Sequence, residues 1–218
     1  PGAGWSVRQL YYACDEGRPR LFDQGLPGFV AGTHEPDRGF VSVLLLPAAA
    51  GAALARHAGD DHRALALLAP RYSANAHAFS TRYQNCNQWL AELLADAWSA
   101  DGAGVGPDTP AERRARAQRW LRDHGYAPTE VVPPWPPLLA VALLLRWLHN
   151  DDHPAEDLAA GRYRISLPPA IEAFVQRREP AARRLEACRT ARHVVLRVDG
   201  PPLDDGCTPG PGDQVRSF

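Results

Sequence analysis

The sequence predicts an α+β fold in which a small, mostly antiparallel sheet is combined with several helices. Short strand-like runs occur on both sides of longer segments with helical spacing. A stretch rich in Gly, Pro and Asp, residues 101–110, separates two halves. We therefore expect a core over residues 1–100, and a helical C-terminal part over residues 107–218 with a short strand and an irregular tail.

The first half is expected to alternate strands and helices before it reaches a cysteine-containing helix. One of its strands is continuously apolar, as in a strand buried on both faces. The Ala/Leu-rich segment is helical by propensity. The expected elements are strands at 5–12 and 40–46, a short helix at 23–30, a helix within 48–69, a loop or edge strand at 71–83, and a helix from Cys86 to about Trp98.

The second half is expected to be mainly helical. Pro136 and Pro137 introduce an apolar run that is too short to cross a bilayer, which takes about 20 residues. The expected elements are helices at 109–124, 138–145 and 169–178, strands at 163–166 and 192–198, and an irregular tail after residue 200.

Composition excludes several classes of function. The formal net charge is −1, so nothing points to nucleic acid or to an anionic membrane surface. None of the four cysteines forms a C-x-x-C pair, which argues against a structural zinc site. Phosphate-loop and hydrolase-elbow motifs are absent as well, so we expect no cofactor and no metal. The oligomeric state does not follow from the sequence.

The stretch around Cys86 carries the strongest chemical signal. Asn85 is a good helix N-cap, and Gln88 stands three residues later, where a capping box has Glu or Gln. Cys86 then becomes the first helical residue, where free N–H groups and the helix dipole favour a thiolate and lower its pKa. These features predict a nucleophile at Cys86, with Asn85, Asn87 and Gln88 forming the cap and the oxyanion region.

The same spacing supports a purely structural interpretation. Cys86 precedes Trp89 and Leu90 by three and four residues, so it shares their apolar stripe. Free cysteine is often simply buried. Both interpretations of Cys86 remain open at this point.

A catalytic thiolate needs an imidazole, and the chain contains eight histidines that could supply it. His77 is nearest in sequence, nine residues upstream, and we name it as the candidate partner; His34 lies in a turn-like segment. The cluster from His149 to His153 is interpreted as a turn after a helix, because no further metal ligands are evident. The arginines of the 109–124 helix are interpreted as a solvated basic face: Arg113, Arg114, Arg116 and Arg119.

Three segments resemble a bacterial family, the domain of unknown function 2145: residues 79–90 with their Asn-Cys-Asn element, residues 5–10, and residues 23–29 followed by 41–47. This likeness implies an exported protein with a signal peptide, and therefore a periplasmic or secreted location. In an exported protein, Cys188 and Cys207 are candidates for a disulfide that closes the C-terminal segment.

The Asn85-Cys86 helix start also resembles the circularly permuted, NlpC-type branch of papain-like proteins. In that branch a histidine on an early strand precedes the cysteine in sequence. The resemblance implies a papain-like core whose N-terminal strand, with its histidine, lies before Pro1. On this basis the chain as given is expected to be nearly inactive.

The leading function is a cysteine-dependent hydrolase or acyltransferase, amidase-like or peptidase-like, that acts on amides or esters of the cell envelope. The alternative is a non-catalytic structural or binding protein of the envelope, with Cys86 as a buried core residue.

Overall fold

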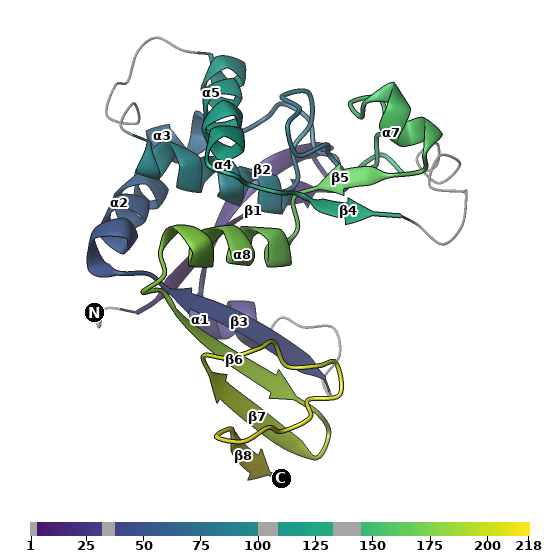
Figure 1. Cartoon of the computed structure of the whole chain (residues 1–218). Helices are drawn as coiled ribbons and strands as arrows, with labels where there is room; N and C mark the ends of the chain where they lie inside the picture. Colours follow the sequence, from purple (N-terminus) through teal and green to yellow (C-terminus); the bar gives the residue numbers. More distant parts are fainter. Residues whose placement is uncertain (1–3, 32–37, 100–108, 133–144) are drawn as a thin grey trace. The chain divides into compact units, whose positions relative to one another are not determined.

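A computed structural model describes residues 4–31, 38–99, 109–132 and 145–218 (Figure 1). Within these residues, helices are combined with small sheets, and every strand pair whose register is defined is antiparallel. The α+β prediction is therefore confirmed. The chain forms two compact units that interleave along the sequence: Pro1–Val7, Asp23–Gly51 and Glu179–Phe218 make up one, and Arg8–Phe22 and Ala52–Arg178 the other. The domain boundaries at residues 100 and 107 stay a prediction.

The first unit contains a four-stranded sheet in the order β3-β6-β7-β8 (Figure 1). Its strands are β3 (Gly39–Leu45), β6 (Arg183–Arg189), β7 (His193–Val198) and β8 (Gln214–Ser217). Cys188 of β6 and Val195 of β7 are register partners on one face, where Leu203 and Cys207 of the C-terminal segment pack against them. The strand expected at 192–198 is confirmed, whereas β6 and β8 were not predicted.

Two expectations for the first unit are wrong in detail. β3 was expected to be buried on both faces, but it is an edge strand of the described sheet and none of its residues is buried. The helix expected at 23–30 is short: α1 spans Leu26–Ala31, and Asp23–Gly25 end strand β2 (Arg18–Gly25). β2 pairs with β1 (Ser6–Ala13), which the sequence did predict.

The second unit holds most of the helices. The Ala/Leu-rich segment is divided into α2 (Ala48–Gly59) and α3 (Asp61–Leu65) at Asp60, whose carboxylate accepts from the N–H groups of His62 and Arg63. The remaining elements are α4 (Cys86–Trp98), α5 (Pro110–Asp123), β4 (Thr129–Val131), α7 (Ala155–Ala159), β5 (Tyr163–Ile165) and α8 (Pro168–Arg178).

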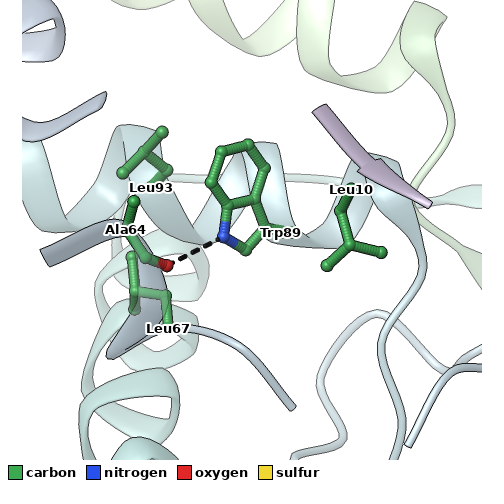
Figure 2. Packing of buried hydrophobic residues seen from close by; sticks show 5 residues of the cluster. All are labelled: Leu10, Ala64, Leu67, Trp89 and Leu93. Carbon is green, nitrogen blue, oxygen red and sulfur yellow. Dashed lines mark hydrogen bonds between the residues drawn. The ribbon is translucent and has the colours of Figure 1, made fainter. Parts of the chain in front are cut away.

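The hydrophobic core of this unit is built around Trp89 of α4. Trp89 is 2% exposed and packs with Leu10, Ala64, Leu67 and Leu93 (Figure 2). Its indole N–H donates to the carbonyl of Ala64 at 3.2 Å, so its polar atom is satisfied inside the core. The cluster joins α4 to strand β1 and to the α3 region, and it fixes the face of α4 that also carries Cys86.

Most of the apolar run at 138–145 and of the linker at 101–110 lies outside the described residues. In the part of the chain that the structure does describe, no helix has the length and hydropathy needed to cross a bilayer.

Candidate functional site

Cys86 is the first residue of α4, and Asn85 is the N-cap of this helix. Asn85 has extended backbone angles (φ −103°, ψ 174°), and its Oδ1 accepts from the N–H of Gln88 at 2.7 Å. The Asn85 amide also donates to the carbonyl of Ala74 at 3.2 Å. The helix start is thereby tied to the loop that precedes it.

The capping box is only half formed. Its second half requires the Gln88 side chain to return to the N–H of Asn85. Instead, the Gln88 amide donates to the carbonyls of His77, Ala78 and Ser80 in the loop. Gln88 therefore acts as a bridge from α4 to the loop and not as a partner of the cap.

The Cys86 thiol is partly buried and contacts the Trp89 cluster. Burial raises the pKa of Cys86, and the N–H groups of Asn87 and of Cys86 itself and the Tyr72 hydroxyl lower it by less. The helix-start donors expected from the sequence are present. The expected net lowering of the pKa is wrong for the described chain, because desolvation of the thiolate outweighs these hydrogen bonds.

Aromatic rings lie close to the thiol. The Tyr72 hydroxyl donates to Cys86, and burial together with the nearby thiolate raises the pKa of Tyr72, so its proton is retained. The rings of Tyr12 and Tyr72 are 5.7 Å apart, and those of Tyr12 and Trp147 are 6.1 Å apart. The surroundings of the thiol are thus apolar, with one phenol as a hydrogen-bond donor.

His77 lies on the other side of α4. Its carbonyl accepts from the side chain of Gln88, and Gln88 and Cys86 are about 200° apart around a helix with 100° per residue. The His77 ring neighbours that of His153 at 5.4 Å, and its Nδ1 accepts from the N–H of Phe79. Burial and His153 lower the pKa of His77 to about 4. The structure describes no contact between His77 and Cys86, and His34 lies outside the described residues.

The segment after residue 148 forms a turn against the 73–77 loop. His153 Nε2 donates to the carbonyl of Asn75 at 2.7 Å, and the Asp152 carboxylate accepts from the N–H of His77 at 3.0 Å. Across the described residues, no group of three or more His, Cys, Asp or Glu side chains is arranged to hold a metal ion.

A buried polar network behind the helix start was not predicted. Glu92 of α4 and Arg114 of α5 form an ion pair with side chains 0% and 1% exposed. One turn further along α4, Asp96 pairs with Arg113. Arg113 and Arg114 were expected on a solvated face, and this expectation is wrong. The signal was available: Glu92 and Asp96, four residues apart within the apolar run from Trp89 to Trp98, need buried cations as partners.

The remaining cysteines are far from this site in sequence. Cys188 and Cys207 form a disulfide with a Cα–Cα distance of 5.4 Å, which closes the C-terminal segment over β6 and β7. Cys14 is free and exposed. Cys86 is therefore the described free thiol that combines a helix start with a partly buried environment.

These features define an α+β domain with a cysteine at the capped N-terminus of a core helix. Residues 1–175 match the model of a family described as uncharacterized protein conserved in bacteria (DUF2145), and the chain belongs to this family. Neither the curated proteins nor the solved structures contain a match to the chain.

Proposed function

We propose that Cys86 is the nucleophile of a cysteine-dependent hydrolase or acyltransferase that acts on amides or esters. The observation that carries the proposal is the position of the sulfur at the first residue of a helix capped by Asn85, within reach of the N–H groups of Cys86 and Asn87. Such donors stabilise a thiolate, and they also stabilise the oxyanion that forms when sulfur adds to a carbonyl.

In the proposed reaction the Cys86 sulfur forms a bond to the acyl carbon, and the leaving amine or alcohol departs with a proton. Water or a second alcohol or amine then takes the acyl group and restores the thiol. Tyr72 donates a hydrogen bond to the sulfur and retains its own proton, so it does not serve as the base. An imidazole must approach the thiol, as the resemblance to permuted papain-like proteins implies. His77 as that imidazole stays a prediction.

The proposed location is the periplasm or the exterior of a bacterial cell, with envelope amides or esters as substrates. The Cys188–Cys207 disulfide supports this location, because such bonds persist in oxidising compartments and are rare in the reducing cytosol.

A second candidate function is supported by the packing of Cys86. Its sulfur contacts the Trp89 core cluster, and burial raises its pKa, as in a structural cysteine. On this alternative the protein is a non-catalytic binding or structural component of the envelope.

Acylation of Cys86 distinguishes the two candidates. The protein produced from its complete natural gene is incubated with p-nitrophenyl acetate, and peptide mass spectrometry locates acetyl groups. The hydrolase proposal expects transient acetylation of Cys86 with turnover, and loss of both in Cys86→Ser. Cys14→Ser is the matched control and should change neither. Absence of an adduct at Cys86, with equal hydrolysis by Cys86→Ser, supports the structural alternative.

A further inference from the structure

Arg114 binds the loop that leads into Cys86. It donates to the carbonyls of Ser80 at 3.1 Å, Thr81 at 2.6 Å and Tyr83 at 2.9 Å. Its Nε and Nη2 donate to the two carboxylate oxygens of Glu92 at 2.8 and 3.1 Å. All three guanidinium nitrogens of the buried Arg114 thus donate hydrogen bonds. Their acceptors are the three loop carbonyls and the two carboxylate oxygens of Glu92.

Buried amides of three glutamines complete the contacts of this loop. Gln118 donates to the carbonyl of Ser80 and to Glu92. The Gln84 side chain donates to Glu92 and to the carbonyl of Leu67 and accepts from the N–H of Ala69. Gln88 holds the loop from α4, as described above. The Ser80 carbonyl is therefore held by two glutamines as well as by Arg114, and Gln84, the residue before Asn85, is anchored through its side chain.

Stability alone does not account for a buried ion pair at this place. Removing a carboxylate and a guanidinium from water costs free energy that their attraction often fails to recover, and apolar pairs of similar volume are frequently as stable. Burial raises the pKa of Glu92 by more than Arg114 and the two amides lower it, which agrees with a large desolvation cost. What apolar side chains cannot supply is a set of donors to loop carbonyls.

We propose that Arg114, oriented by Glu92, is a positioning residue for Cys86. By holding the carbonyls of Ser80, Thr81 and Tyr83, it fixes the turn in which Asn85 caps α4 and directs the N–H groups of the first turn at the sulfur. The proposal rests on the proposed function for its biological meaning, because an accurately placed thiol matters only where the thiol reacts.

The chain contains a matched control for this network. Arg113 and Asp96 also join α5 to α4, with N–O distances of 3.0 and 2.7 Å and side chains 8% exposed. Among the described contacts, Arg113 donates to Asp96 and to none of the carbonyls of the 77–84 loop. The two pairs share burial and geometry but differ in their link to Cys86.

The test compares two double variants, Glu92→Leu with Arg114→Met and Asp96→Leu with Arg113→Met. The rate of Cys86 alkylation by iodoacetamide is measured between pH 7 and 11.5 by peptide mass spectrometry, because burial raises the pKa of this thiol, and melting temperature reports folding. The rate plateau at high pH reports access to the sulfur, while the midpoint reports its pKa. We expect the first variant to raise the midpoint by about half a unit, the size of a weakened helix-start interaction. We expect the second variant to leave the midpoint unchanged.

Equal midpoints in the wild type and the Glu92/Arg114 variant would overturn the positioning role, and so would an equal shift in the Asp96/Arg113 control. If the Glu92/Arg114 variant does not fold, Arg114→Lys gives the same comparison, because it keeps a cation beside Glu92 but cannot reproduce the guanidinium donors to the carbonyls of Ser80, Thr81 and Tyr83. Its midpoint should also rise, and an unchanged midpoint would count against the proposal. If p-nitrophenyl acetate leaves no acetyl group on Cys86 of the wild-type protein, the proposed function is refuted. The alkylation midpoints still test the positioning role of Arg114 in that case.

Discussion

Replacement of Asn85 by alanine tests the helix start on which the candidate site depends. The change removes the cap acceptor of the Gln88 N–H, which is worth about 1 kcal/mol of unfolding free energy. It also removes the donor to the carbonyl of Ala74, a partly buried hydrogen bond worth about 1 kcal/mol. We therefore expect Asn85→Ala to lower the unfolding free energy by about 2 kcal/mol.

The same substitution should change the chemistry of the thiol. As the first turn of α4 frays, the N–H groups near the sulfur become less well aligned, so the pKa of Cys86 should rise further. Asn85→Asp should keep the cap but place a carboxylate beside the sulfur, and should raise this pKa by repulsion. Urea unfolding followed by tryptophan fluorescence measures stability, and alkylation of Cys86 against pH measures the pKa.

Thr109→Ala is the matched control for both measurements. Thr109 caps α5 through a complete capping box with Glu112, and it lies away from Cys86 in sequence. Its loss should cost about 1 kcal/mol and leave the pKa of Cys86 unchanged. If Asn85→Ala changed stability by no more than Thr109→Ala and left the alkylation midpoint in place, the reasoning about this helix start would be refuted.

Three further predictions concern other parts of the chain. Trp89→Phe should lower the unfolding free energy by about 2 kcal/mol, because it leaves the carbonyl of Ala64 without its donor in the core. A urea titration that gives a value within about 0.5 kcal/mol of wild type would contradict this, because surface substitutions commonly cause changes of that size. Replacing both Cys188 and Cys207 by serine should cost about 3 kcal/mol from the loop that the disulfide closes, and early loss of amide protection in β6 and β7 should report it. Because the pKa of His77 is lowered to about 4 from 6.5, the unfolded chain binds the proton first, so stability should fall as pH is lowered from 6.5 to 4. His77→Asn should flatten this slope in urea titrations across that range, and an unchanged slope would assign the proton uptake to another group.

The sequence predicted the elements whose patterns are local. The Cys86 helix and its Asn85 cap, the α5 start at Thr109 and Pro110, and the strand now called β7 carry their signals in consecutive residues. Strand β6 was missed because its buried positions include Arg184 and Glu186, which hide the usual polar–apolar alternation, and its identity as a strand depends on pairing with β3 and β7. Such pairing is a long-range property that propensity alone does not reveal.

The sequence predicted which cysteine lies at the candidate site, but it did not predict the side chains that surround this cysteine. The position of Cys86 follows from Asn85 and the apolar stripe, but the balance between helix-start donors and burial depends on Tyr72 and the Trp89 cluster. The buried state of Arg114 was misjudged because a run of arginines on one helix is usually solvated. Its burial follows from Glu92, which the sequence places on a different helix.

The edge strand β3 has a consequence for how this family is delimited. The family match ends at residue 175, whereas β3 lies inside the match and β6, to which it hydrogen-bonds, lies beyond it. A related chain that stopped at the match boundary would expose the backbone of Gly39–Leu45 together with Phe40, Val43 and Leu45, a combination that invites pairing with another molecule. A chain cut at the end of the family match would therefore lose the strand that pairs with β3, and its four-stranded sheet would be incomplete.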